Sequence, residues 1–240
     1  MRLAPVEAPQ QHLDAREHDG VGRRKRLADQ PRGRRQALLA LEYKLLSYVS
    51  HLVQFAKQEH KAPALLKMNP RGRVPVLKDD DYVCFESLAI LQYLDRKYPE
   101  PPLFGRTAEE AGTIMRVICE YQSYAEEHIM RIIQAILFQG VEGRMEEVER
   151  AMGYVLKEAA TIEQRLATSA WLVGEAFSAA DIIVFPGIQM LLRSLERREA
   201  QELRTRFVPL EGNFPAIAAW VGRVQTLPGY ERTVPPHWKE

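Results

Sequence analysis

Residues 69–87 read NPRGRVPVLKDDDYVCFES and hold the most informative local pattern of the chain. Two short runs, 73–77 and 82–85, are rich in the β-branched and aromatic residues that favour strands. The polar residues 78–81 between them are typical of a tight turn, so the pattern predicts a β-hairpin. Apolar residues at helical spacing then predict a helix over 87–98.

The Val74-Pro75 pair opens the first of these strands. An X-Pro bond can be cis in an ordered loop, and a cis bond here would leave the backbone of Val74 free to pair with an extended peptide ligand. The alternative is an ordinary trans proline at the first residue of a strand. These residues alone leave both interpretations open.

Glu86-Ser87 stands where the second strand passes into the helix. A helix N-terminus presents unpaired amides and a partial positive charge, which suit a ligand carboxylate. Ser87 can add a hydroxyl donor and Glu86 can accept from an ammonium, although a serine at this place often serves only as a cap. Upstream, Glu59-His60-Lys61 offers cations for a second carboxylate, or is simply a solvated charge run.

Working outward, the chain divides at Pro99-Glu100-Pro101-Pro102, a stiff linker. Before it, the pattern predicts a helix from residue 37, a short strand over 48–55 and a short helix over 60–68. Beyond it, the β signal nearly vanishes. The later segments are predicted as helices over 107–139, 141–167, 179–195 and 214–225, with an extended tail over 234–238. The fold class is a small α/β unit followed by an all-helical domain.

Residues 177–181 read FSAAD and form a capping box, in which Ser178 and Asp181 exchange hydrogen bonds with each other's backbone amides. The motif precedes a strongly apolar run, so we interpret it as the structural start of a buried helix, with no catalytic role.

Composition excludes several classes of protein. Of 240 residues, 46% are hydrophobic and 27% are charged, which rules out wholesale disorder. The net charge of +1 argues against a chain-wide nucleic-acid surface. Two cysteines, Cys84 and Cys119, are too few for a disulfide scaffold and indicate a reducing, cytoplasmic compartment. No apolar run is long enough for a membrane helix, and no secretion signal is expected.

Residues 1–36 differ from the rest. They hold nine basic and five acidic residues, a net charge of +4, against 24 and 27, or −3, in the remaining 204. They contain no aromatic residue and only Val6 and Val21 among β-branched types, so we expect low order there and no strand beside 48–55. Their basic residues are expected to be solvated rather than to bind nucleic acid.

The order of these motifs over residues 37–240 resembles the soluble glutathione transferases. Segments 40–46, 177–182 and 235–238 are similar to the rho class of fish, and 59–63 is similar to the plant phi class. The resemblance implies a thioredoxin-like glutathione-binding domain over 37–98 whose first strand is missing or replaced, a linker over 99–106 and an all-helical domain over 107–240.

Carried over residue by residue, the resemblance implies that Val74 pairs with the cysteinyl unit of glutathione next to a cis Pro75. The remaining glutathione contacts are implied for Glu86 and Ser87 at the γ-glutamyl end, for His60 and Lys61 near the glycyl carboxylate, and for Arg73. Arg116, Tyr121 and Tyr124 are candidates for the electrophile pocket by position only, and packing within the helical domain is an equal alternative.

The implied activity is addition of glutathione, as co-substrate, to small hydrophobic electrophiles in detoxification, by a cytoplasmic homodimer that needs no metal and binds neither nucleic acid nor membrane. The thiol activator, however, is unknown. Pro31 stands where relatives carry the catalytic serine, and Arg34 where a cysteine is common; Tyr43 is the sole hydroxyl or thiol before Lys44.

Three explanations of the missing activator stay open. The first is that residues 1–36 are not the native start of the protein. The second is that the protein binds glutathione or another ligand without catalysis. The third is that an unusual group, such as Arg34 or Arg35, stabilises the thiolate.

Overall fold

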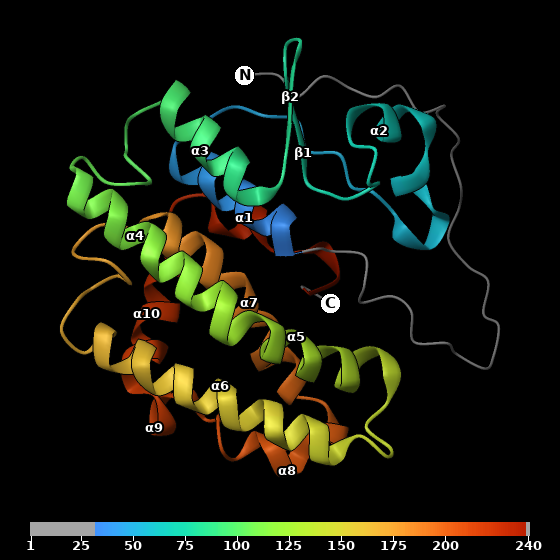
Figure 1. Cartoon of the computed structure of the whole chain (residues 1–240), viewed down its shortest axis with the longest axis vertical. Helices are drawn as coiled ribbons and strands as arrows, with labels where there is room; N and C mark the ends of the chain where they lie inside the picture. Colours follow the sequence, from blue (N-terminus) through green and yellow to red (C-terminus); the bar gives the residue numbers. More distant parts are fainter. Residues whose placement is uncertain (1–31, 239–240) are drawn as a thin grey trace.

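The computed structural model describes residues 32–238 of the chain. Figure 1 shows a smaller N-terminal unit lying against a larger set of helices. The helices and strands of the N-terminal unit are α1 (Arg32–Tyr43), two 3-10 turns (Phe55–Lys57 and Glu59–Lys61), α2 (Pro63–Met68), β1 (Val76–Asp79), β2 (Tyr82–Phe85) and α3 (Ser87–Lys97).

All regular secondary structure among the described residues of the second unit is helical. Its principal helices are α4 (Ala108–Glu120), α5 (Glu126–Gln134), α6 (Met145–Leu166), α7 (Ala179–Leu195) and α10 (Pro215–Gln225). Its short helices are α8 (Gln201–Arg204), α9 (Leu210–Asn213) and α11 (Tyr230–Thr233). Its other turns are two π turns (Tyr121–Ala125 and Ala135–Gln139) and two 3-10 turns (Arg198–Ala200 and Pro236–Trp238). None of the helices between residues 32 and 238 combines the length and apolarity needed to span a bilayer.

The predicted hairpin is confirmed, with a shorter first strand and a tighter turn. β1 and β2 pair antiparallel with Val76 opposite Phe85 and Asp79 opposite Tyr82, so only Asp80 and Asp81 lie in the turn. The Val74–Pro75 peptide, just before β1, is cis, as the resemblance implies.

The strand predicted over 48–55 is wrong. Residues 46–54 are neither helix nor strand, because a strand needs a neighbour for its hydrogen bonds and β1 pairs only with β2 in the described part of the chain. The extended tail is also corrected, since Pro236–Trp238 form a 3-10 turn.

The first helix begins earlier than the pattern predicts. α1 starts at Arg32, and Arg35 and Gln36 are buried at 2% and 6% exposure, so the low order expected for 1–36 is wrong for 32–36. The Gln36 side-chain amide donates to the Ile183 carbonyl of α7 at 3.0 Å. The rest of that segment, residues 1–31, lies outside the described residues.

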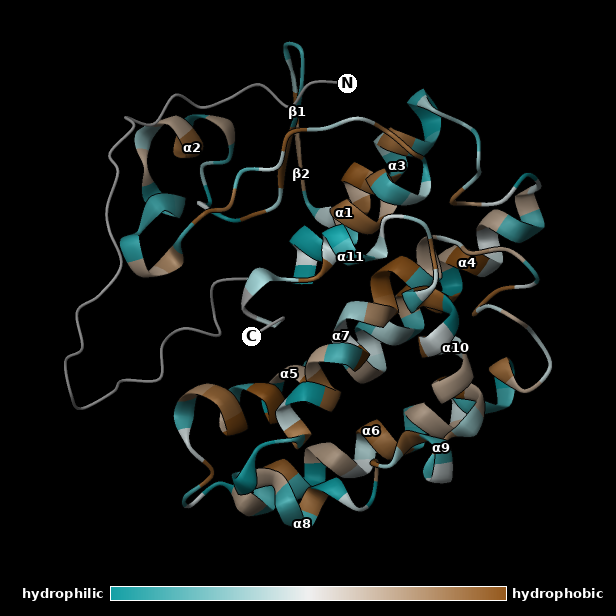
Figure 2. Cartoon of the chain, turned by 180° about the vertical axis from the view of Figure 1, so that it is seen from behind, coloured by the Kyte–Doolittle hydropathy of each residue, from teal (hydrophilic) through white to brown (hydrophobic). Residues whose placement is uncertain are grey.

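α1 connects the two units. It packs against α3 on one side and against α7 and α11 on the other. Its apolar residues Leu39, Ala40 and Leu41 are almost fully buried, and Figure 2 shows hydrophobic residues gathered where α1 and α3 meet. Burying each leucine contributes about 1.5–3 kcal/mol.

α7 forms the core of the helical domain, and its start confirms the capping box. The carboxylate of Asp181 accepts from the Ser178 amide at 2.9 Å, and Ser178 caps the first turn. Phe185 meets Trp220 of α10 edge to face, with ring centroids 5.7 Å apart.

Gly187 of α7 is expected to tolerate no side chain. A Cβ there would overlap the Tyr121 hydroxyl and lie 3.2 Å from Tyr121 Cζ, so Gly187→Ala should cost about 1–3 kcal/mol of unfolding free energy in urea. Gly153→Ala in α6, with open space around its Cβ, should instead stabilise by about 0.5–1 kcal/mol. Adding Tyr121→Phe should recover part of the loss; no recovery would contradict the clash.

Candidate functional site

The hairpin register brings two predicted pieces of the site together. Val76 lies opposite Phe85, so continuing the antiparallel register toward the start of β1 places Pro75 near Glu86 and Val74 near Ser87. The backbone before β1 therefore meets the N-terminus of α3.

The first turn of α1 closes this junction. A Cβ added to Gly33 would lie 2.6 Å from both Pro75 Cδ and Ser87 Oγ, so three separate segments converge on one glycine. A side chain at position 33 would displace the Ser87 hydroxyl or the proline ring. Sequence reasoning missed Gly33, because its neighbours are 42 and 54 residues away in the chain.

Glu86 and Ser87 have the geometry expected of a carboxylate-binding helix start. Ser87 is the first residue of α3, and Glu86 precedes it as an exposed N-cap whose side chain makes no capping bond. Glu86 has φ of +69°, a region that a residue with a Cβ seldom occupies. Since the Glu86 side chain makes no capping bond, it does not occupy the first amides of α3.

Asn69 shapes the loop that leads into Val74. Its buried side chain donates to the Arg73 carbonyl at 2.9 Å and accepts from the Arg71 amide at 3.1 Å. One amide side chain thus supplies both a donor and an acceptor, which holds the turn closed.

Asn69→Asp is expected to lower the unfolding free energy by about 1–3 kcal/mol, because it keeps the acceptor but sets a carboxylate against the Arg73 carbonyl. The matched control is Asn213→Asp, since the exposed Asn213 makes a similar bond to the Pro209 carbonyl at 3.0 Å. The control should change the urea midpoint little. Equal effects at the two positions would contradict the loop role of Asn69.

The predicted cations flank the same loop. A Cβ on Gly72 would lie 2.8 Å from the His60 carbonyl and 2.9 Å from Lys61 Nζ, so residues 60–61 pack directly on the turn before Arg73. Half-buried His60 stacks on Phe55 with centroids 4.5 Å apart, while Lys61 and Arg73 are exposed. The structure therefore places His60 and Lys61 against the turn that precedes Arg73.

The three electrophile-pocket candidates lie in different environments. Arg116 is exposed and pairs with Glu120 at 3.7 Å, and Tyr124 is 59% exposed. Tyr121 is buried beside Gly187, and burial raises its pKa to about 12. Tyr121 therefore packs within the helical domain, and the three side chains do not form one wall.

An ion pair that the sequence analysis did not predict joins α1 to the helical domain. Arg32, the first residue of α1, forms an ion pair with Glu126 of α5. The charge pattern of each helix alone gives no signal of this contact, because it joins residues 94 positions apart.

The two arginines considered as thiolate stabilisers, Arg34 and Arg35, lie in different environments. Arg35 is buried, donates to Gln189 Oε1 at 2.5 Å and lies over the Phe185 ring. Arg34 donates to Ser50 Oγ at 3.0 Å and lines a cavity together with Pro75. Burial lowers the pKa of Arg34 without bringing a guanidinium near neutrality. Arg34 is thus the better placed of the two.

Tyr43 is remote from the junction. Its ring contacts Phe177 edge to face at 4.8 Å, and desolvation raises the pKa of its hydroxyl. The single hydroxyl in the first 44 residues therefore faces the contact between α1 and the helical domain.

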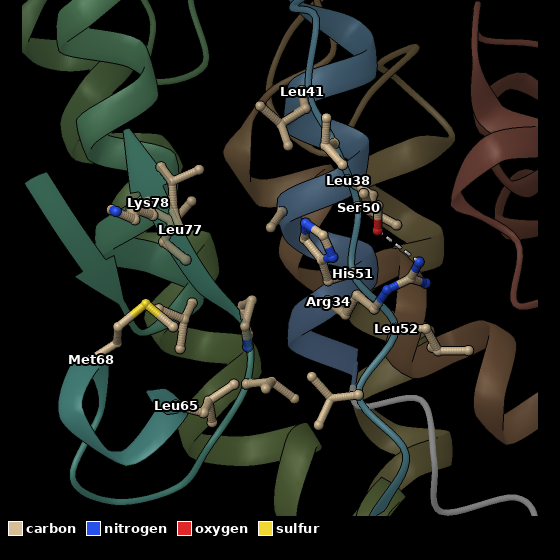
Figure 3. Close-up of a pocket in the computed structure, with 17 residues that line it drawn as sticks. Arg34, Leu38, Leu41, Ser50, His51, Leu52, Leu65, Met68, Leu77 and Lys78 are labelled. Atoms are coloured by element: carbon tan, nitrogen blue, oxygen red, sulfur yellow. Dashed lines mark hydrogen bonds between the residues drawn. The ribbon is translucent and has the colours of Figure 1, made fainter. Parts of the chain in front are cut away.

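A cavity of about 130 Å³ lies beside the junction (Figure 3). Residues 49–53 line one side, 74–78 the other, and α1 contributes Arg34, Leu38 and Leu41. Leu65 and Met68 of α2 close the end shown below β1 in Figure 3. Glu86 and Ser87 do not line it.

Two family models match the chain: "Glutathione S-transferase, N-terminal domain" over residues 31–96 and "Glutathione S-transferase, C-terminal domain" over 124–228. Similar proteins include glutathione S-transferase 4 of Zea mays, 30% identical over 77% of this chain and 79% of that protein. Glutathione S-transferase A of Pleuronectes platessa is 28% identical over 85% and 88%. The structure of a glutathione S-transferase from the Antarctic clam Laternula elliptica aligns with a TM-score of 0.73 and 26% identity, covering 88% of this chain and 90% of that one.

Proposed function

The chain belongs to the glutathione S-transferase family, and from this premise we propose that it binds glutathione at the junction of the 74–75 loop and α3 and conjugates it to small hydrophobic electrophiles. The observation that carries the proposal is the convergence of Pro75, Ser87 and Gly33 at one point. The proposed domain order is a glutathione domain ending at residue 98, a linker over 99–106 and a helical domain from 107. Cytoplasmic location, a homodimer and a detoxifying role belong to the same proposal.

The binding residues divide among the parts of glutathione. The Val74 backbone pairs with the cysteinyl amide and carbonyl as a short strand would. The Ser87 amide and hydroxyl hold the γ-glutamyl carboxylate at the helix N-terminus, and Glu86 accepts from its ammonium. His60, Lys61 and Arg73 lie toward the glycyl carboxylate.

The chemistry requires the thiolate, whose parent thiol has a pKa near 8.5. We propose Arg34 as the group that favours the anion by its charge. The thiolate then attacks an electrophilic carbon, forming the C–S bond while the leaving group departs with its electron pair. In an addition reaction, the adjacent carbon instead takes up a proton from water.

A non-catalytic, ligand-binding protein of the same fold is the second candidate. The placement of Tyr43 against Phe177 favours it, because no hydroxyl between residues 32 and 44 is directed to the junction. Both candidates predict retention on immobilised glutathione, and only the enzyme predicts turnover of an aryl halide.

The site is tested by Glu86→Ala, with Glu146→Ala on the exposed face of α6 as a matched control. Losing a charge-assisted bond should weaken glutathione binding about tenfold to a hundredfold in calorimetry, and the control should bind like the parent chain. If the folded parent chain does not bind glutathione, both candidate functions are contradicted.

The thiolate role of Arg34 is tested by the pH dependence of kcat/KM with 1-chloro-2,4-dinitrobenzene. Without the cation the thiol pKa rises, so Arg34→Ala should shift the profile upward by about one unit and lower the rate about tenfold at pH 6.5. Arg34→Lys should keep most of the rate, and Arg150→Ala, exposed on α6, should keep the parental profile. If the pH profile of Arg34→Ala is unchanged, Arg34 does not stabilise the thiolate. If the parent chain binds glutathione but does not turn over the substrate, the second candidate is favoured.

A further inference from the structure

The first turn of α1 is a helix start that its own residues disfavour. Three of its first four residues, Arg32, Arg34 and Arg35, are cations, and none is acidic. A helix N-terminus carries a partial positive charge, so cations at this end oppose the helix macrodipole. Contacts with other segments therefore hold the turn in place, and this is the turn that brings Gly33 to the junction.

Each arginine of the turn contacts a different part of the chain. Arg32 pairs with Glu126 of α5, and Arg34 donates to Ser50 Oγ at 3.0 Å. Arg35 contacts three segments at once, namely α7, α11 and the 3-10 turn at Pro236–Trp238. The buried Arg35 is therefore the contact that joins the start of α1 to the C-terminal segment.

Three aromatic rings surround the Arg35 guanidinium, and we call them the Arg35 cage. The guanidinium carbon lies 5.5 Å from the ring centroid of Phe185, 5.8 Å from that of Tyr230 and 4.9 Å from that of Trp238. A cation within about 6 Å of a ring face is attracted by the ring quadrupole, most strongly by tryptophan. The attraction is stronger where the cation is desolvated, and Arg35 is only 2% exposed.

Trp238 is the ring of the cage that comes from the C-terminal turn. Figure 1 shows this turn beside the start of α1. The Trp238 ring also lies 5.1 Å from the guanidinium carbon of Arg193, so it contacts α1 and α7 together. Phe185 and Tyr230 are buried within helices, whereas Trp238 is half-buried in a short 3-10 turn. The contact of Trp238 is therefore the one in the cage that costs least to break.

We propose that Trp238 is a positioning residue of the glutathione site: its ring face over Arg35 holds the first turn of α1, and with it Gly33, against the 74–75 loop and α3. This inference rests on the proposed function, because it assigns a further residue to the same glutathione site. Coupling between two sites is reciprocal, so glutathione at the junction also steadies the C-terminal turn.

The first test measures the affinity of the full chain for glutathione by calorimetry. Trp238→Ala should weaken binding about fivefold to fiftyfold, the range of ordinary coupling between sites. Trp238→Phe keeps a ring face and should stay within about threefold of the parent, whereas Trp238→Leu keeps apolar cover without a ring and should resemble the alanine variant. Trp171→Ala is the matched control, because its ring contacts Phe177 rather than Arg35, so the folded variant should bind glutathione like the parent.

The second test measures hydrogen exchange and does not require glutathione. The amides of residues 36–39 donate to the carbonyls of 32–35 in an α-helix, so they report whether the first turn is formed. They should exchange at least about fivefold faster in Trp238→Ala than in the parent, in Trp238→Phe or in Trp171→Ala. In the parent, added glutathione should slow exchange of the Trp238 amide, which donates to the Pro235 carbonyl at 2.9 Å.

The outcomes separate this inference from the proposed function. Unchanged glutathione affinity in Trp238→Ala, or equal affinities in Trp238→Leu and Trp238→Phe, would contradict the positioning role of the ring. Unchanged exchange at residues 36–39 would show that Trp238 does not hold the first turn of α1. A folded parent that does not bind glutathione contradicts the proposed function, and the exchange comparison still decides whether Trp238 holds α1.

Discussion

Asp181→Ala is expected to lower the unfolding free energy by about 3–5 kcal/mol. The carboxylate is fully buried and accepts from the Leu172 amide at 3.0 Å, the Ser178 amide at 2.9 Å and Trp220 Nε1 at 2.8 Å. Alanine would leave these buried donors without an acceptor, and the first turn of α7 would lose its cap.

Urea denaturation followed by circular dichroism measures the loss. Asp181→Asn retains the size and one acceptor, so it should fall between the parent and the alanine variant. Glu149→Ala, an exposed acid of α6, serves as the control and should change the free energy by less than about 0.5 kcal/mol. A loss below 1 kcal/mol in Asp181→Ala would show that water replaces the carboxylate.

Lys44→Met is expected to cost about 3–5 kcal/mol, because it removes a buried charge and leaves its partners unpaired. The Lys44 side chain is fully buried, and its ammonium donates to Asp95 Oδ1 at 3.0 Å. It also donates to the carbonyls of Tyr98 and Pro101, each at 2.6 Å, and so ties the end of α1 to the end of α3 and to the linker.

The double variant Lys44→Met with Asp95→Asn separates the charge pair from the carbonyl contacts. Its loss should be smaller than the sum of the two single losses, because the second change removes the uncompensated carboxylate. Lys157→Met, on the exposed face of α6, should cost little. Strict additivity in the double variant would mean that Lys44 acts through its carbonyl contacts alone.

Local patterns were sufficient where the interactions are local. The hairpin, the helix from Ser87 and the capping box at Ser178 depend on residues a few positions apart, and the structure confirms each of them. The resemblance added the cis peptide before Pro75 and the two-domain order.

The features that the sequence could not predict depend on contacts between residues far apart in the chain. Residues 48–55 have β propensity but no neighbouring strand in the described part of the chain, so the propensity was not realised. Gly33, the Arg34–Ser50 bond and the Arg32–Glu126 pair depend on segments that meet only after folding. The position of Tyr121 was ambiguous for the same reason, since its environment is made by Gly187 on another helix.

α1 is covalently part of the first unit, yet it buries its side chains against both units at once. Its loss would expose the α7 surface around Ile183 as well as the inner face of α3. Residues 99–102 therefore separate the two units along the chain, but the shared helix α1 makes us expect the units to unfold together. A protease that cuts there would leave two fragments still held together, and calorimetry would register one melting event for the pair.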